Sequence, residues 1–183
     1  LNVRLRLRSE LPNILKSFDA SGLMVTHDPE EAMAICDKVA VMNDGFIHQN
    51  DKPLEIINKP KTLFVSSFIL GNNILKTKVI DKHLNTCIGK LKLQKYPKNI
   101  KINFLSISPK SISIKKSING KAKVIAKEFL GDFFVYKVLI GNDEIRIRTS
   151  FENKFSIGER CDVYPMKNKE FYIYPGSYKN III

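Results

Sequence analysis

The feature that most constrains the fold is a change in hydrophobic spacing near residues 71–73. After Asn73 the apolar residues gather in short runs rich in Ile, Val, Phe and Tyr, separated by Gly, Asn, Asp or Pro. Such runs are typical of small barrels and sandwiches. We therefore predict an all-β domain over residues 73–183, of the oligonucleotide-binding (OB) type. The predicted strands are residues 74–80, 86–93, 100–107, 112–115, 121–129, 133–140, 144–148, 161–164 and 170–174.

Residues 1–72 mix helical and strand patterns, and we predict an α/β segment there. The spacing of apolar residues predicts a helix over residues 4–18, which Pro12 should kink or divide. Asn43-Asp44-Gly45 predicts a tight hairpin turn between two short strands. The remaining predictions are strands at residues 23–26, 39–42 and 46–48 and short helices at residues 53–58 and 62–70.

A strong helix start follows the predicted buried strand at residues 23–26. Asp28 suits the N-cap, Pro29 suits the first helical position, and Glu31 completes a pattern like a capping box. The helix should end near residue 36 or 37. His27 would then stand at the carboxyl end of a strand and directly before a helix N-terminus.

The formal net charge of +12 belongs to the second part of the chain. Residues 73–183 hold 22 Lys and Arg against 9 Asp and Glu, whereas residues 1–72 hold 8 against 9. A basic half can mark a nucleic-acid or anionic-membrane surface. The alternative is an ordinary solvated surface, which we favour because Lys outnumbers Arg by 24 to 6 and Arg is preferred for bidentate phosphate recognition.

His27 is the best single candidate for a chemical role. Ligands of open α/β sheets bind at the carboxyl ends of strands, beside helix N-termini that favour anions. His27 could there contact a phosphate or an attacking water, although a single His is more often structural or merely exposed. His48 and His83 lack such a context and are expected on the surface.

Several site types have no counterpart in the sequence. There is no GxxxxGK[ST] phosphate loop and no pair of carboxylates placed to hold Mg²⁺. Cys36, Cys87 and Cys161 are too far apart for a CxxC metal site or a disulfide framework. No apolar run reaches the about 20 residues that cross a bilayer. Taken alone, these residues should not bind ATP tightly or hydrolyse it.

The first part of the chain resembles the switch-histidine region of ABC transporter ATPases. Residues 25–33 read VTHDPEEAM and residues 36–45 read CDKVAVMNDG. Residues 53–60 and 63–69 are similar to the tail found in the importer branch that handles ferric iron, polyamines, sulfate or sugars. This resemblance covers most of residues 1–75.

The second part resembles the regulatory β-domain, called TOBE, that follows in those ATPases. Residues 107–112 (ISPKSI) are similar to its IRPEDI element, with Ser108, Lys110 and Ser111 in place of the usual Arg, Glu and Asp. Residues 128–132 (EFLGD) match its EFLG element, and residues 157–163 (IGERCDV) resemble its glycine turn and strand.

The resemblance implies roles for three residues. His27 would be the switch histidine, contacting the γ-phosphate of ATP and the attacking water. Leu1 and Asn2 would be the end of the D-loop at the dimer interface, with Asn2 in place of the usual Asp. The phosphate loop, signature and Walker B carboxylates would lie upstream of residue 1, so the chain would be a C-terminal portion of the nucleotide domain (residues 1–72) with a regulatory domain (residues 73–183).

The resemblance also implies cofactors and partners. The intact family protein uses ATP and Mg²⁺, forms a homodimer and drives membrane permease subunits fed by a substrate-binding protein, at the cytoplasmic face of a bacterial plasma membrane. No nucleic-acid partner is expected. Two alternatives remain: an inactive gene fragment, or a basic OB-type module that binds nucleic acid. Stacking platforms for such a module would be Phe133, Phe134, Tyr136, Tyr172 and Tyr174.

Overall fold

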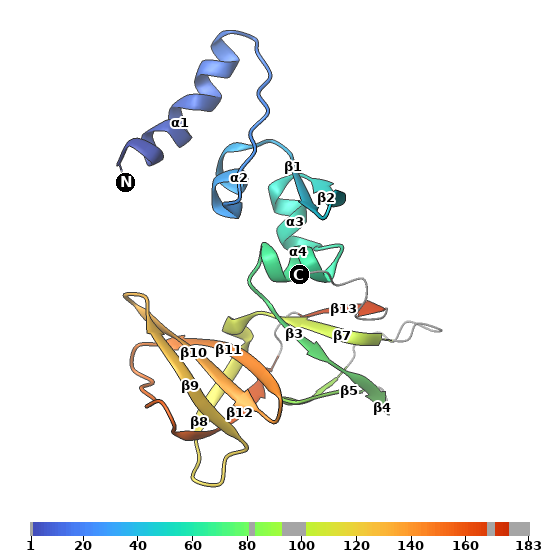
Figure 1. Cartoon of the computed structure of the whole chain (residues 1–183), viewed down its shortest axis with the longest axis vertical. Helices are drawn as coiled ribbons and strands as arrows, with labels where there is room; N and C mark the ends of the chain where they lie inside the picture. The colour runs from blue at the N-terminus through green and yellow to red at the C-terminus, as the bar shows by residue number, and fades with distance from the viewer. Residues whose placement is uncertain (1, 81–82, 93–101, 168–170, 176–183) are drawn as a thin grey trace. The chain divides into compact units, whose positions relative to one another are not determined.

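The computed structural model describes residues 2–80, 83–92, 102–167 and 171–175. The chain divides into two compact units, Leu1–Val65 and Ser66–Ile183, each described here by itself (Figure 1). Short helices and one hairpin make up the first unit, whereas the second is rich in β-strands. The chain changes unit between residues 65 and 66, earlier than the domain boundary proposed from the sequence. No described helix is long and apolar enough to span a membrane.

Two helices open the first unit. α1 (Asn2–Ser17) continues through Pro12, so the proline does not divide it. α2 (Pro29–Ile35) begins at the predicted cap, Asp28. The strand predicted at residues 23–26 is wrong: no described strand pairs with this segment, and Leu23 and Val25 are 95% and 91% exposed. An apolar run becomes a strand only when a neighbouring backbone accepts and donates its hydrogen bonds.

The predicted hairpin is confirmed. β1 (Val39–Asn43) pairs antiparallel with β2 (Phe46–Asp51), and Asn43 lies opposite Phe46. The two residues between them, Asp44 and Gly45, have φ angles of 47° and 78°. Positive φ at both central residues is the geometry of a type I′ turn, which matches the twist of the two strands.

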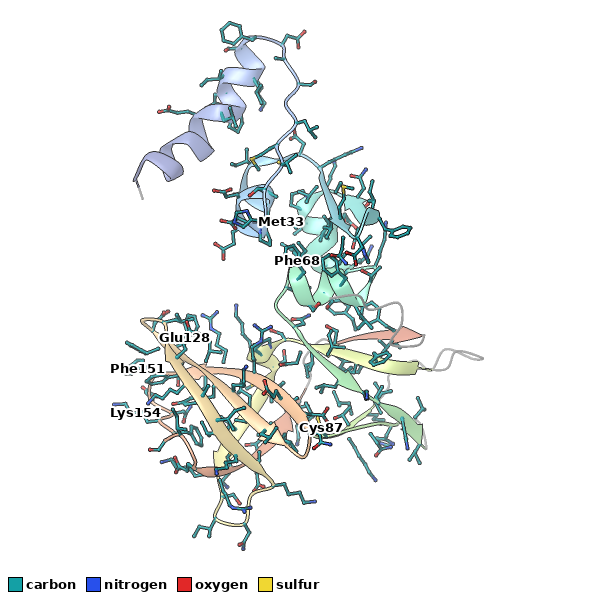
Figure 2. All side chains as sticks on the ribbon, viewed as in Figure 1. Met33, Phe68, Cys87, Glu128, Phe151 and Lys154 are labelled. Atoms are coloured by element: carbon teal, nitrogen blue, oxygen red, sulfur yellow. The ribbon has the colours of Figure 1, made fainter. Side chains whose placement is uncertain are left out.

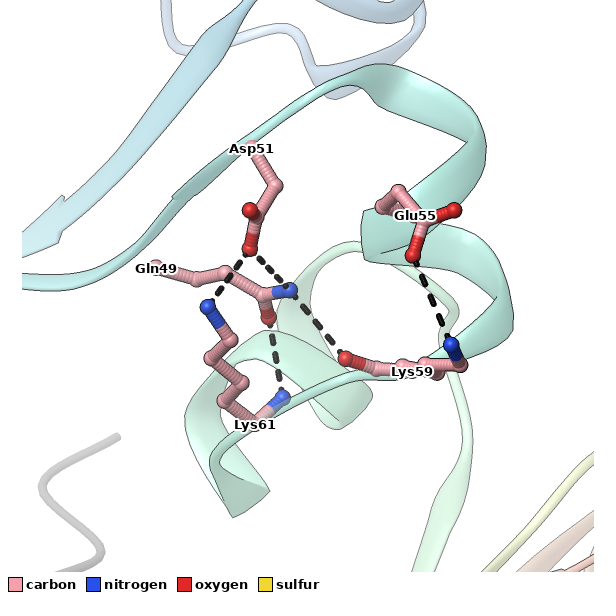
Figure 3. A network of polar contacts seen from close by, with 5 residues as sticks. All are labelled: Gln49, Asp51, Glu55, Lys59 and Lys61. Carbon is pink, nitrogen blue, oxygen red and sulfur yellow. Dashed lines mark hydrogen bonds and ion pairs between the residues drawn. The ribbon is translucent and has the colours of Figure 1, made fainter.

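A buried amide ties this hairpin to the helices that follow it, α3 (Pro53–Asn58) and α4 (Leu63–Phe68) (Figure 3). Gln49 is 3% exposed, and its Nε2 donates to Asp51 Oδ2 (3.0 Å) and to the Lys59 carbonyl (3.1 Å). Its Oε1 accepts from the Lys61 N–H (2.9 Å). Lys61 Nζ also lies 2.8 Å from Asp51, and its hydrogen bond lowers the pKa of that carboxyl.

The second unit contains three antiparallel sheets. The largest has five strands in the order β11-β10-β9-β12-β8, and two smaller sheets have the orders β13-β7-β3 and β4-β5-β6. The strands are β3 (Asn73–Lys76), β4 (Lys78–Ile80), β5 (His83–Thr86), β6 (Gly89–Lys92), β7 (Ile102–Ile107), β8 (Ile112–Lys116), β9 (Ala122–Phe129), β10 (Phe133–Ile140), β11 (Asp143–Ser150), β12 (Arg160–Pro165) and β13 (Phe171–Pro175). A short 3-10 turn, η1 (Pro109–Ser111), precedes β8.

One apolar core joins the three sheets of this unit. Tyr136, Val138, Ile145 and Ile147 are each 0% exposed and come from β10 and β11. These residues alternate along their strands with outward-facing side chains, as a half-buried sheet requires. The alternating prediction for residues 144–148 and the predicted strand 133–140 are thus confirmed.

Two predicted strands of this unit differ from the structure. The strand predicted over residues 74–80 is broken at Thr77 into β3 and β4, which belong to different sheets. The strand predicted over residues 86–93 is confirmed only in part: Cys87 and Ile88 form the turn between β5 and β6, residues 89–92 are β6, and residue 93 lies outside the described residues. Ile88 is 2% exposed, so a buried turn residue produced the apolar pattern of a strand.

The chain entering this unit is tied to β11. The Asn73 side chain donates to the Arg146 carbonyl and accepts from the Arg146 N–H, both at 2.8 Å. The Arg146 guanidinium also donates to the Gly71 carbonyl at 2.9 Å. Asn73 is 6% exposed, so these bonds satisfy a buried amide that would otherwise destabilise the fold.

Candidate functional site

His27 lies on the surface, in a bend directly before α2. The prediction that it ends a buried strand is wrong, because residues 23–26 form no strand in the described structure. The side chain of His27 is exposed, so the imidazole can reach a ligand or a partner surface.

The residues on both sides of His27 are held by a local hydrogen-bond network. Asp28 Oδ1 accepts from the backbone N–H groups of Glu30 (2.9 Å) and Glu31 (3.4 Å), which confirms the predicted cap. The Asp28 N–H donates to Thr26 Oγ1 at 3.0 Å, and the Thr26 hydroxyl donates to Glu31 Oε2 at 3.0 Å. In a capping box the Glu31 carboxylate would accept directly from the Asp28 N–H, whereas here the Thr26 hydroxyl lies between the two groups.

This network positions His27 without using its ring. Thr26 and Asp28 fix the main chain before and after the histidine, so the imidazole projects from a defined point. Asp28 accepts from the N–H groups of Glu30 and Glu31 in the first turn of α2, and Thr26 accepts from the N–H of the cap residue Asp28, so these three N–H groups are not available to an anion. What the arrangement offers chemically is one exposed imidazole that can accept or donate a single proton or hydrogen bond.

The described residues around His27 do not form a site for ATP and Mg²⁺ by themselves. Within the described parts of the chain, no group of three or more His, Cys, Asp or Glu residues could hold a metal ion. The nearby carboxylates of Asp28 and Glu31 are engaged in the cap network. His27 could therefore serve a nucleotide only where other chain segments supply the phosphate and metal ligands.

The structure treats the other predicted site residues differently. Asn2 is the first residue of α1, and Leu1 lies outside the described residues. His48, expected on the surface, is half-buried: its Nδ1 lies 3.3 Å from Thr62 Oγ1 and its ring centroid 4.8 Å from that of Phe64. His48 therefore has a packing role in the first unit.

Three of the five aromatic residues suggested for base stacking are buried. Phe134, Tyr136 and Tyr174 are 8%, 0% and 8% exposed, so they belong to the core. Phe133 is half-buried, and the Arg148 guanidinium lies over its ring at 3.4 Å from the centroid. Base stacking needs an accessible ring face. Phe134, Tyr136 and Tyr174 do not supply one, whereas Phe133 and Tyr172 are half-buried, so three of the five suggested rings give the nucleic-acid alternative no support.

Thr26 is the residue of this site that sequence reasoning missed. The signal was present, because a Thr two residues before an N-cap Asp can accept its N–H in a local side-chain turn. The bond to Glu31 depended on where the first turn of α2 places that carboxylate, which the residue types alone do not determine.

Comparison with known proteins gives matches for part of the chain. No family model matches it. The chain is 50% identical over 78 residues to the spermidine/putrescine import ATP-binding protein PotA of Bacillus anthracis, a region that covers 42% of this chain and 24% of that protein. The PotA protein of Trichormus variabilis is 42% identical over 79 residues, covering 43% of this chain and 21% of the relative. The matched region is thus about a quarter of the length of these relatives. Over that region, the chain is homologous to the ATP-binding subunits of ABC importers.

Proposed function

We propose that the chain is the C-terminal part of the ATP-binding subunit of an ABC importer. In this role residues 1–72 complete a nucleotide domain, and residues 73–183 form an OB-like regulatory domain of the TOBE type. The single observation that carries the proposal is the capped segment Thr26–Glu31, which presents His27 on the surface of a chain that is homologous over 78 residues to an import ATP-binding protein.

His27 has the catalytic role in this proposal. Its imidazole contacts the terminal phosphate and the attacking water of ATP held by the rest of the nucleotide domain, which supplies the phosphate-binding and Mg²⁺-binding residues. Thr26, Asp28 and Glu31 are positioning residues, because their bonds fix the backbone that carries His27. Two such subunits form a dimer around ATP, with Leu1 and Asn2 near its interface. They act on permease subunits at the cytoplasmic face of a bacterial plasma membrane and are linked through these to a substrate-binding protein.

The proposed cargo is a small solute, and the names of the relatives favour a polyamine. Ferric iron was one of the cargoes implied by the family resemblance, and these relatives do not support it. The chain by itself should neither bind ATP tightly nor hydrolyse it.

A chimera tests the role of His27. The C-terminal region of the Bacillus anthracis relative is replaced by this chain, and ATP hydrolysis is measured in the purified chimera and in its His27→Ala variant. We expect a loss of about 10²-fold or more in kcat with ATP affinity retained, as for removal of a positioned proton-transfer group. The control is His83→Gln, on β5 of the second unit, which should leave kcat unchanged.

Equal kcat for the chimera and its His27→Ala variant would refute the proposed role. A second arm measures uptake of labelled spermidine and of ferric iron in cells that lack their own importer for each. Uptake of iron but not spermidine would overturn the proposed cargo while leaving the ATPase role intact.

A further inference from the structure

A pocket of about 200 Å³, open to solvent, lies on the second unit and is lined by residues of that unit alone. It opens where the β5–β6 turn meets the five-stranded sheet, and Cys87, labelled in Figure 2, forms part of its wall. A single water needs only about 10–15 Å³, so the pocket can hold a small organic molecule. It is smaller than the about 300–1,000 Å³ typical of sites for drug-sized ligands. The lining residues used in the argument are Ile88, Lys121, Ala122, Ile140, Asp162 and Val163.

The pocket combines an aliphatic wall with one cation and one anion. Ile88, Ala122, Ile140 and Val163 are buried or half-buried and supply the apolar surface. Lys121 and Asp162 also line the pocket, and both have exposed side chains. An apolar wall with a few convergent polar groups is the usual composition of a small-molecule site.

The two charged residues lie beside one cross-strand pair of β9 and β12. Ala122 on β9 lies opposite Cys161 on β12, so Lys121, just before Ala122, and Asp162, just after Cys161, follow the same antiparallel pair. Within the described residues neither Lys121 nor Asp162 forms an ion pair with another side chain. Both charges are therefore available to a ligand.

The Cys87 thiol adds a neutral group to the wall. Burial and the nearby Asp143 carboxylate raise the pKa of this thiol to about 11, so it stays protonated at neutral pH. Among the described residues no cluster of His, Cys, Asp or Glu around it could hold a metal ion. The lining of the pocket thus supplies one ammonium, one carboxylate and an apolar surface, and the Asp143 carboxylate lies behind the Cys87 thiol, which is hydrogen-bonded to it.

This combination selects between classes of small ligand. A simple carboxylate would meet Lys121 favourably but would be repelled by Asp162. An amine or a polyamine would meet Asp162 but would be repelled by Lys121. A molecule that carries both charges on neighbouring atoms satisfies both side chains, and charge-assisted hydrogen bonds of this kind are among the stronger ones.

We propose that this pocket binds a small zwitterion, an α-amino acid with a short aliphatic side chain. Its carboxylate pairs with Lys121 Nζ, its ammonium group pairs with the Asp162 carboxylate, and its side chain packs on the aliphatic wall. The proposal uses residues of the second unit alone, so it stands independently of the ATPase role proposed for His27. It gives the β-rich unit a ligand distinct from the polyamine cargo.

Calorimetric titration of the full chain with L-valine tests the proposal. The matched probes are isobutylamine, which lacks the carboxylate, 3-methylbutanoate, which lacks the ammonium group, and spermidine. We expect L-valine to bind with a Kd of about 1 mM, which suits so small a ligand. Each probe with a single charge should bind at least about tenfold more weakly. Three results would overturn the proposal: equal binding of L-valine and isobutylamine, tighter binding of spermidine than of L-valine, or no heat of binding from L-valine at about 20 mM.

Variants locate the two charges. Lys121→Met and Asp162→Asn should each weaken L-valine binding at least about tenfold. Lys123→Met, two residues further along the chain on β9, is the matched control, because Lys123 does not line the pocket, and it should bind like the parent. The exchange variant K121D/D162K keeps both charges and should recover binding relative to either single variant. Unchanged binding in both single variants would refute the site, and far-UV circular dichroism confirms that each variant folds.

Discussion

Removing one hydroxyl group from the core of the second unit should lower its stability by a measurable amount. Tyr136 is 0% exposed on β10, and its ring packs between Phe134 (centroids 5.6 Å apart) and Phe155 (5.3 Å). Its hydroxyl accepts from the Phe155 N–H at 3.0 Å and donates to the Asn153 carbonyl at 3.2 Å. The hydroxyl therefore holds the segment that follows β11 against the sheet.

The variant Tyr136→Phe keeps the ring and its packing but removes both hydrogen bonds. The buried Phe155 N–H then has no partner, and an unsatisfied buried donor costs about 1–3 kcal/mol. In a domain of this size each kcal/mol lowers the Tm by about 4 °C. We therefore expect the Tm of this unit to fall by about 4–12 °C, with faster hydrogen exchange at the Phe155 amide.

Urea and thermal unfolding followed by far-UV circular dichroism measure the change, with amide exchange read by NMR. The control is Tyr164→Phe on β12, where the side chain is 45% exposed and a change within about 0.5 kcal/mol is expected. The reasoning fails if Tyr136→Phe unfolds at the same urea concentration as the parent and the Phe155 amide keeps its protection.

Three further variants test other contacts. Gly120→Ala should destabilise the second unit by about 1–3 kcal/mol in urea unfolding, because the new methyl group would overlap the main chain of Cys161, and an unchanged midpoint would contradict this. Asp28→Ala should cost α2 about 1 kcal/mol and speed exchange of the two amides that the carboxylate accepts, whereas Asp28→Asn should largely preserve them. The pKa of the Glu159 carboxyl is lowered in the folded state, mainly because the Ser156 N–H donates a hydrogen bond to it. The ionised carboxyl therefore stabilises the fold above its unfolded pKa near 4.5. This stabilisation is lost as the pH falls through the lower pKa of the folded state. The Tm difference between the parent and Glu159→Gln should thus be constant above about pH 5 and shrink at lower pH; a difference that grows with acid would refute the sign.

Local chemistry predicted the local structure well. Asn43-Asp44-Gly45 specifies a two-residue turn through its tolerance of positive φ, and the Asp28-Pro29 start of α2 depends on bonds within one helical turn. The strand predicted at residues 23–26 was wrong, and the one at residues 86–93 missed the turn at residues 87–88, because an apolar run shows only that side chains favour burial. Whether the backbone pairs or turns depends on distant segments.

The candidate site was predictable to the same extent. His27 was recognisable from its immediate neighbours, and the cap beside it follows from residue types alone. Its exposure was not, since this depends on the missing strand partner of residues 23–26. The pocket containing Lys121 and Asp162 could not be predicted, because its walls come from turns and strands that are distant in sequence and meet only in the folded sheets.

The arrangement β13-β7-β3 has a consequence for how portable the second unit is. Its first and last strands flank the same central strand, so Lys76 and Tyr174 both lie opposite Phe104. Adjacent strands are about 4.8 Å apart, which places the two outer strands within about 10 Å of each other. Both outer strands are antiparallel to β7 and therefore parallel to each other, so β3 begins opposite Ile107 whereas β13 ends opposite Ile102, near the other end of the sheet. A circular permutant opened at the Gly141–Asn142 turn therefore needs a crossover linker of about a dozen residues to keep its native sheet order. A linker of only a few residues would have to stretch along the sheet, and it would favour exchange of β13 between two copies of the unit over closure within one copy.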